Sequence, residues 1–225
     1  MILNLFGGGR RRDDGADLPA ERGPLRLAIG HAVEIDALSL QADLLGADAE
    51  PAMGPPEGGP FVVAAHGVAS MDADTELHRY YDDAHRLLQV MAPPGGTEAD
   101  VLDVSLYAPW DSVVPAGRAE WDRWTGPRGL IGAPRYDADG IVFGRYWGEG
   151  SEHAPLVEFV EEVDDGETVR SIHQRCMLYS RPVGRVEEML LINVERDLAD
   201  RARSEGASVE FLIGYGLGPA DVRRV

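Results

Sequence analysis

Hydrophobic and polar residues alternate along most of the chain after residue 26, and this period of two is typical of half-buried β-strands. In residues 27–35, Val33 and Ile35 fall on one face and Glu34 falls on the other. His31 shares the apolar face, which favours a core histidine bonded to the backbone over a catalytic base. Further strand candidates lie at 61–71, 75–81, 86–91, 101–107, 141–147, 157–163, 169–179, 186–194 and 209–215.

Turn signals separate these runs, whereas helical signals are few. Asp139-Gly140 and Asp165-Gly166 each predict a tight hairpin. Short helices are expected at 117–124 and 198–204, each ended by a following glycine. Because strands far outnumber helices, the expected fold class is α+β and β-dominated, with mostly antiparallel sheets packed as a sandwich or bent barrel and one or two short helices.

The composition suggests a polar N-terminal segment followed by one folded region. Residues 1–22 combine glycines, arginines and acids with little apolar content, so we expect a flexible N-terminal tail. Residues 23–225 are expected to form a single β-rich domain. The Pro93-Pro94-Gly95-Gly96 stretch marks a boundary near 93–100 at which two subdomains would divide.

Charge and residue usage exclude several classes of function. The formal net charge of -18 opposes nonspecific binding to nucleic acid. All 21 basic residues are arginine, so Schiff-base chemistry and a Gly-Lys-Ser/Thr phosphate loop are excluded. The single cysteine, Cys176, excludes intrachain disulfides and multi-cysteine metal centres.

The N-terminus favours a cytoplasmic location. The apolar run 1–6 precedes Arg10, Arg11 and Arg12 and is too short for a signal-peptide core or a transmembrane segment. A weak peripheral membrane contact through this segment is the alternative.

The densest group of possible ligand residues surrounds the strand candidate at 75–81. Nitrogen and carboxylate groups together suit a divalent metal. An EF-hand is excluded because Leu77 stands where its glycine is required, and the chain has no His-Glu-x-x-His pattern. The competing interpretation is a solvated turn beside a polar strand face. This ligand or metal cluster comprises His66, Asp72, Asp74, Glu76, His78, Asp82, Asp83 and His85.

The remaining candidate functional side chains are more typical of structural packing than of catalysis. His173 and Cys176 are three residues apart on one strand candidate and therefore point to opposite faces. Cys176 shares its face with apolar residues, which is typical of a buried, inert thiol. Trp121 and Trp124 have helical spacing and are expected to pack the short helix onto a sheet. No catalytic residue and no cofactor is assigned.

Several segments together resemble a known family. Residues 76–83 (ELHRYYDD), 120–127 (EWDRWTGP) and 145–148 (RYWG) resemble the YjfK-like proteins, an uncharacterised bacterial family, and the similarity extends from about residue 23 to the C-terminus. The resemblance implies no catalytic residues. It implies an association with an envelope-stress gene neighbourhood that includes proteins similar to phage-shock protein A.

These observations lead to three expectations of function. The first is a nonenzymatic interaction or adaptor protein with a protein partner in the cytoplasm. The second is a hydrolase or metal-assisted enzyme that uses His78, Asp82 and Asp83. The third is a protein that binds a polyamine or a basic segment, because residues 27–78 contain nine acidic residues and no arginine.

Overall fold

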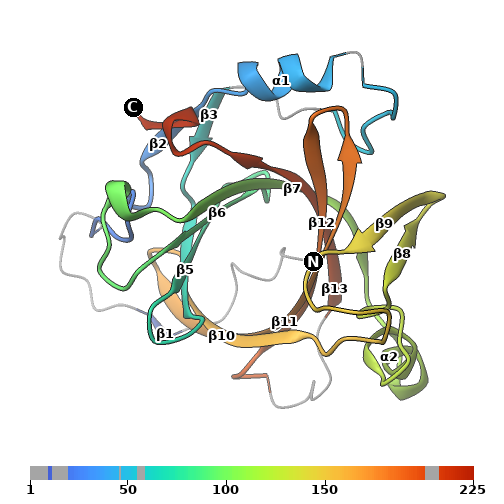
Figure 1. Cartoon of the computed structure of the whole chain (residues 1–225). Coiled ribbons are helices and arrows are strands. Elements are labelled where there is room, and N and C mark those ends of the chain that lie inside the picture. The colour runs from blue at the N-terminus through green and yellow to red at the C-terminus, as the bar shows by residue number, and fades with distance from the viewer. Residues whose placement is uncertain (1–9, 12–19, 46, 55–58, 201–207) are drawn as a thin grey trace.

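The computed structural model describes residues 10–11, 20–45, 47–54, 59–200 and 208–225. Within these residues, eight strands form a closed antiparallel barrel (Figure 1). The β-dominated fold class is thus confirmed, and the barrel is the packing that forms. In order around the barrel the strands are β4 (Ala65–Ser70), β5 (Glu76–Tyr81), β6 (Leu87–Ala92), β7 (Asp103–Val113), β13 (Ser208–Leu217), β12 (Val186–Asp197), β11 (Thr168–Val183) and β10 (Val157–Asp164).

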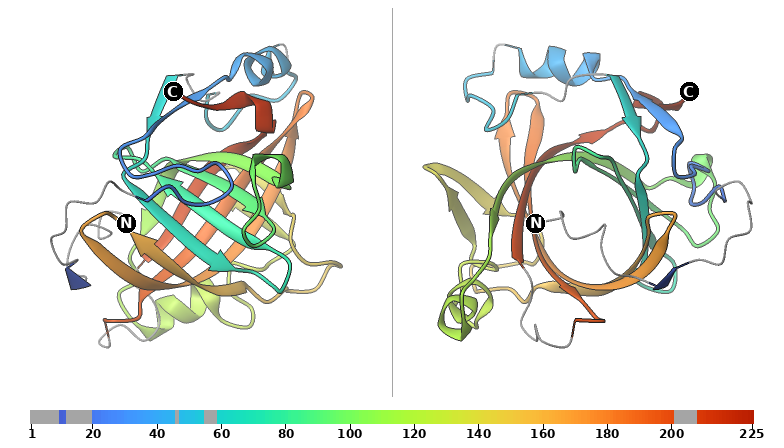
Figure 2. Two further views of the ribbon diagram at one scale, coloured as in Figure 1. Left: turned by 90° about the vertical axis from the view of Figure 1, so that its left-hand side faces the viewer. Right: turned by 180° about the vertical axis from the view of Figure 1, so that it is seen from behind.

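Two antiparallel meanders build the barrel, one from β4 to β7 and one from β10 to β13. Two pairings between strands distant in sequence join them. β7 pairs with β13 from Val104↔Leu217 to Val113↔Val209, and β10 pairs with β4 from Glu162↔Val68 to Asp164↔His66. The right view of Figure 2 shows the closed ring that results. Closure leaves these eight strands without a free barrel edge.

A hairpin and a helix lie beside the second meander. The hairpin is β8 (Arg135–Ala138) and β9 (Ile141–Arg145), and β9 pairs with β11. Its turn has positive φ at both Asp139 and Gly140, as the tight-turn signal predicted. The predicted helix at 117–124 forms as α2 (Arg118–Thr125), and Trp121 and Trp124 pack against the outer face of the barrel as expected.

A second, three-stranded sheet covers another part of the outer barrel wall. Its order is β14 (Val222–Arg224), β2 (Ala32–Ile35) and β3 (Gly59–Val62). Val33 and Phe61 from this sheet pack with Tyr80, Leu88 and other outward residues of the first meander. The remaining elements are α1 (Leu38–Leu44), β1 (Arg10–Arg11), η2 (Glu98–Asp100) and η3 (Pro219–Asp221).

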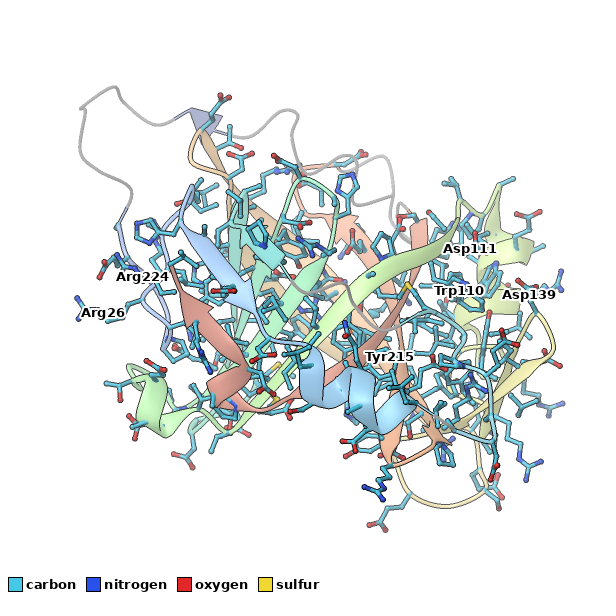
Figure 3. All side chains as sticks on the ribbon, turned by 90° about the horizontal axis from the view of Figure 1, so that it is seen from above. Arg26, Trp110, Asp111, Asp139, Tyr215 and Arg224 are labelled. Carbon is cyan, nitrogen blue, oxygen red and sulfur yellow. The ribbon has the colours of Figure 1, made fainter. Side chains whose placement is uncertain are left out.

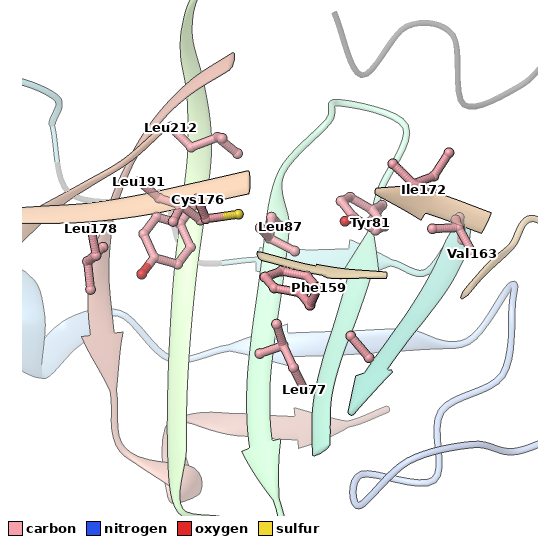
Figure 4. Packing of buried hydrophobic residues seen from close by; sticks show 13 residues of the cluster. Leu77, Tyr81, Leu87, Phe159, Val163, Ile172, Cys176, Leu178, Leu191 and Leu212 are labelled. Carbon is pink, nitrogen blue, oxygen red and sulfur yellow. The ribbon is translucent and has the colours of Figure 1, made fainter. Parts of the chain in front are cut away.

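Because both faces of the barrel wall are buried in places, alternate residues of one strand enter different cores. In β5, Leu77 and Tyr81 belong to the inner cluster shown in Figure 4, whereas Tyr80 belongs to the outer cluster under the small sheet. The same alternation places Arg79 inside, where its side chain is 1% exposed.

Several strands differ in their bounds from the predicted runs, and two of these differences have a clear physical reason. The run at 61–71 divides into β3 and β4, because β3 pairs within the small sheet and β4 pairs within the barrel. The strand expected from residue 27 begins only at Ala32, because Gly30 adopts a φ of +86° that lies outside the β region.

The helical predictions were incomplete. Helix α1 was not predicted, and it has no side-chain cap at Ala37. In the helix expected at 198–204, residues 198–200 are not helical and the rest lies outside the described residues.

Most of the predicted tail at 1–22, including the apolar run 1–6, also lies outside the described residues. Residues 93–96 begin the connection between β6 and β7, which also contains η2, and these two strands pair with each other. In the described ranges, no helix has the length and apolar content needed to cross a membrane.

Two glycines on β13 give a matched test of packing in the barrel wall. A Cβ at Gly214 would overlap the Leu106 carbonyl oxygen, whereas a Cβ at Gly216 would meet nothing within 4 Å. We expect Gly214→Ala to lower the free energy of unfolding by about 1–3 kcal/mol through overpacking. Gly216→Ala should change it by less than about 0.5 kcal/mol. Urea denaturation of both variants measures the difference, and equal stabilities would contradict this register of β7 and β13.

Candidate functional site in the barrel interior

The eight residues of the predicted ligand cluster lie in three separate places. Asp72 and Asp74 belong to the exposed turn between β4 and β5, where the Asp72 carboxylate accepts a hydrogen bond from the Asp74 amide at 2.8 Å. Asp82, Asp83 and His85 belong to the turn between β5 and β6, at the other end of the strand. In the described part of the chain, no group of three or more His, Cys, Asp or Glu side chains is arranged so that it could hold a metal ion.

Asp82 has a structural role in its turn. Its carboxylate accepts hydrogen bonds from the Ala84 amide, from the Arg86 amide at 2.8 Å and from Arg86 Nε at 2.6 Å. These three contacts fix the β5–β6 turn, and they occupy the oxygens that a metal would need.

The third place is the outer face of β4 and β5, where His66, His78 and Glu76 meet. His66 Nε2 lies 3.3 Å from His78 Nδ1, and His78 Nε2 lies 3.6 Å from Glu76 Oε2. His66 also stacks on Tyr80 with ring centroids 4.6 Å apart. Burial lowers the pKa of His66 to about 3 and also lowers the pKa of His78. Both imidazoles are therefore neutral near pH 7, and His78 lies close beneath Gly23.

The barrel interior holds a different polar cluster, centred on the ion pair between Arg79 and Glu161. Arg79 Nη1 donates to Glu161 Oε2 at 3.3 Å, and Arg79 Nε donates to Gln89 Oε1 at 3.1 Å. The guanidinium also lies over the Phe159 ring, 5.1 Å from its centroid. Burial is the largest single effect and disfavours the charge of Arg79, but Glu161, Tyr81 and Cys176 together outweigh it and raise the pKa of Arg79. Arg79 is therefore a permanent cation inside the barrel.

Glu161 accepts three hydrogen bonds from side chains of two strands, β5 and β11. In addition to Arg79, the Tyr81 hydroxyl donates to Oε1 at 2.8 Å and Gln174 Nε2 donates to Oε2 at 3.0 Å. The Glu161 side chain can reach Arg79 and Tyr81 because residue 67 of β4 is a glycine. A Cβ at Gly67 would overlap the Glu161 carboxylate. A residue without a side chain thus opens the path between β10 and β5.

Cys176 and Glu195 complete the interior cluster. The Cys176 thiol interacts with the Arg79 guanidinium, and burial raises its pKa to about 12. Glu195 Oε1 accepts a hydrogen bond from Gln174 Nε2 at 3.4 Å. Burial, followed by the charge of Glu161, raises the pKa of the Glu195 carboxyl. The thiol stays protonated near neutral pH, as the sequence indicated for an inert cysteine.

Several interior polar atoms have no hydrogen-bond partner among the described residues. They are Arg79 Nη2, Gln174 Oε1 and Asn193 Oδ1, from side chains that are no more than about 2% exposed. Most buried polar atoms in proteins are paired, and each unpaired one costs about 1–3 kcal/mol. Unpaired donors and acceptors that face a barrel interior are what a polar ligand would satisfy.

Sequence reasoning missed this cluster because its members are spread from residue 79 to residue 195. A local signal was nevertheless present. Each polar residue interrupts an apolar stripe: Arg79 lies between Leu77 and Tyr81, and Asn193 follows Leu191 on the same face of β12. A polar residue at an inward position of an otherwise apolar strand therefore marks the interior site.

Removal of the Arg79 side chain tests how far the barrel depends on the interior ion pair. Arg79→Met would leave the Glu161 carboxylate buried without its counter-charge, so we expect a loss of about 3–5 kcal/mol in the free energy of unfolding. Arg26→Met is the matched control, because Arg26 is 77% exposed in its ion pair with Glu21. Arg26 lies at the edge of the molecule beside Arg224 (Figure 3).

The control should unfold almost like the parent, since exposed ion pairs contribute little. Chemical denaturation provides the measurement. Equal effects of the two substitutions would mean that the interior pair does not support the barrel.

The outer histidine pair predicts a pH dependence of stability. The unfolded chain binds a proton at His66 below its ordinary pKa of 6.5, whereas the folded chain resists protonation down to about 3. Stability is therefore lost as the pH falls below 6.5, by up to about 1.4 kcal/mol per pH unit from this residue. His66→Phe keeps a ring on Tyr80 and should reduce the loss between pH 6.5 and about 4. Thermal unfolding of parent and variant across this pH range provides the measurement. An equal loss of stability in both proteins would argue against a neutral, buried His66.

Comparison with known proteins gives a family without an assigned activity. No curated protein and no solved structure matches the chain. The match to a family described as "Protein of unknown function (DUF2491)" covers residues 1–223, nearly the whole sequence. The chain therefore belongs to this family of unknown function.

Proposed function

We propose that this protein is a nonenzymatic binding protein that holds a small polar molecule inside its barrel. The observation that carries this proposal is the set of buried interior atoms without partners, namely Arg79 Nη2, Gln174 Oε1 and Asn193 Oδ1. A bound ligand that donates to the two amide oxygens and accepts from the guanidinium would recover their lost hydrogen bonds.

The architecture supports this proposal. An eight-stranded barrel has an interior that side chains fill or that accommodates one small ligand. On β4 the inward positions are occupied by the small residues Ala65, Gly67 and Ala69. The Glu161 carboxylate of the adjacent strand β10 lies over Gly67. An interior with a small number of polar groups suits selective binding of a molecule with few polar groups.

The protonation of the interior supports binding over catalysis. Burial holds the thiol of Cys176 in its protonated form, with a pKa of about 12. Burial and the nearby Glu161 carboxylate also hold the pKa of Tyr81 well above its ordinary value. A general acid or base works best with a pKa near the operating pH, and these two groups lie far from it.

The other functions expected from the sequence have less geometric support. The metal-assisted enzyme would use His78, Asp82 and Asp83, and the first of these lies on the outer strand face whereas the other two lie in a turn. An adaptor role, a protein partner, a cytoplasmic location and the envelope-stress association implied by the YjfK-like resemblance stay predictions. Binding of a small molecule is compatible with each of them.

Native mass spectrometry of the full-length protein tests the proposed function. We expect the gently purified protein, or the protein after incubation with a deproteinised cell extract, to carry a small molecule at a 1:1 ratio. Asn193→Leu replaces an unpaired interior amide with an apolar side chain of similar size and should remove the bound mass. Glu158→Leu changes the outer face of the same barrel and should keep it.

The absence of bound mass in both preparations of the parent protein would overturn the proposed function. Equal retention by both variants would also overturn it, because the ligand would then lie outside the barrel.

A further inference from the structure

The inner apolar cluster reaches solvent at one end of the barrel. Met71 follows β4, Met91 lies near the end of β6 and Met189 lies near the start of β12, and all three are partly buried against this cluster. Because neighbouring barrel strands are antiparallel, the ends of β4 and β6 and the start of β12 lie at the same end of the ring. We call this end, lined by Met71, Met91 and Met189, the methionine mouth.

The interior atoms without partners lie together further inside. Arg79 Nη1 and Gln174 Nε2 both donate to Glu161 Oε2, at 3.3 Å and 3.0 Å, so the guanidinium and the amide are neighbours. Cys176 interacts with Arg79 and stands directly opposite Asn193 in the pairing of β11 and β12. Directly opposed residues have Cβ atoms about 4.5–5.5 Å apart. The unpaired Arg79 Nη2, Gln174 Oε1 and Asn193 Oδ1 therefore belong to one part of the interior, which we call the polar layer.

Apolar side chains connect the polar layer to the methionine mouth. On β5, Leu77 is the next inward residue after Arg79 in the direction of the mouth. On β12, the inward residues after Asn193 in the same direction are Leu191 and Met189. At about 3.3 Å per residue, these paths of two to four residues span about 7–13 Å. A molecule that reaches the polar layer from the mouth therefore needs a polar head and an apolar chain.

The polar layer needs two donors and one acceptor from its ligand. Gln174 Nε2 donates to two carboxylates, of Glu161 and Glu195, and a flipped amide would place acceptors against each other. Gln174 Oε1 is therefore the atom left without a donor, and Asn193 Oδ1 likewise has none among the described residues. Arg79 Nη2 is a donor without an acceptor. The Gln174 and Asn193 side chains are 2% exposed, so bulk water does not reach them.

The charges of the polar layer favour a neutral head. Arg79 and Glu161 form an ion pair at 3.3 Å, and both side chains are 1% exposed. An anion that accepts from Arg79 Nη2 would approach the Glu161 carboxylate, and a cation that donates to Gln174 would approach the Arg79 guanidinium. Polyamine binding by the acidic segment 27–78 is therefore a separate expectation and stays a prediction.

A primary carboxamide matches the polar layer in number and in kind. It has two N–H donors, one carbonyl acceptor and no charge. A hydroxyl has only one donor for the two amide oxygens, and a carboxylate has none. Methionine side chains adapt to apolar partners of different shape, which suits the chain end of such a molecule.

We infer that the barrel binds an amphiphile whose primary carboxamide head contacts Arg79, Gln174 and Asn193 and whose apolar chain extends to the methionine mouth. This inference rests on the proposed function and specifies the chemical class of its ligand.

Isothermal titration calorimetry of the full-length protein with octanamide near neutral pH tests the inference. Octanoate and octylammonium have the same chain with a charged head, and butanamide has the same head with a shorter chain. We expect saturable 1:1 binding of octanamide. The other three probes should bind about tenfold more weakly or less, because they lose either the neutral head or part of the apolar contact.

Two methionines give a matched pair of variants. Met91 lies in the methionine mouth, whereas Met53 is partly buried against the outer apolar cluster that contains Tyr179 and Phe211. Met91→Gln places a polar group beside the chain and should weaken octanamide binding by about fivefold or more. Met53→Gln makes the same change outside the barrel and should alter the affinity by less than about twofold. Thermal melts check that both variants fold.

A variant in the polar layer tests the head separately. Asn193→Leu removes one acceptor and should weaken octanamide and butanamide by the same factor, about tenfold.

Several results would overturn the inference. Binding of octanoate or octylammonium as tight as that of octanamide would exclude a neutral head, and equally tight binding of butanamide would exclude a chain contact. Equal effects of Met91→Gln and Met53→Gln would exclude the methionine mouth. If octanamide does not bind while native mass spectrometry still finds an Asn193-dependent ligand, the carboxamide class is wrong and the proposed function stands. If neither method finds a ligand, both fail.

Discussion

The constraint on which the rest of the structure depends is the closure of the barrel through two pairings between distant segments. β10 meets β4 across about ninety residues of sequence, and β7 meets β13 across a similar separation. Neither meander could bury its inner face alone. Once both pairings form, the inward residues of all eight strands share one interior, and polar groups there must find partners in the interior itself.

The interior cluster follows from this constraint. Arg79 and Glu161 belong to different meanders, so their ion pair spans the β10–β4 junction and stabilises the closure that brings them together. Gly67 lies between them in the register and leaves the space that the Glu161 side chain crosses. The strand pairing and the interior ion pair therefore depend on the same three residues, Gly67, Arg79 and Glu161.

Much of the fold could be predicted because the strands and turns of the barrel wall have signals in short stretches of the sequence. The period of two identified β5, β6 and most of the second meander, and Asp139-Gly140 identified a turn with two positive φ angles. The divided run at 61–71 could not be predicted, since local pattern does not indicate that β3 and β4 join different sheets. Helix α1 was missed because Ala37 provides no capping side chain.

The candidate site was harder to predict than the fold. Possible ligand residues are most concentrated in the sequence at 66–85. In the structure, the alternation of strand faces and the length of β5 separate their side chains. The interior cluster combines residues from β5, β6, β10, β11 and β12, and only strand order and register bring them together. The sequence signal for the interior cluster is Arg79, an inward arginine between two apolar residues. Its partner Glu161 can be identified only from the β10–β4 pairing that closes the barrel.

The hairpin of β8 and β9 has a consequence for how this protein can be studied. Its turn at Asp139 and Gly140 projects away from the ring, and Asp139 stands at the side of the molecule opposite Arg26 and Arg224 (Figures 1 and 3). The chain there already adopts a turn that needs no barrel residue. A fluorescent label or affinity tag inserted at this tip would report on the protein without touching the barrel interior, which makes the hairpin a natural attachment point.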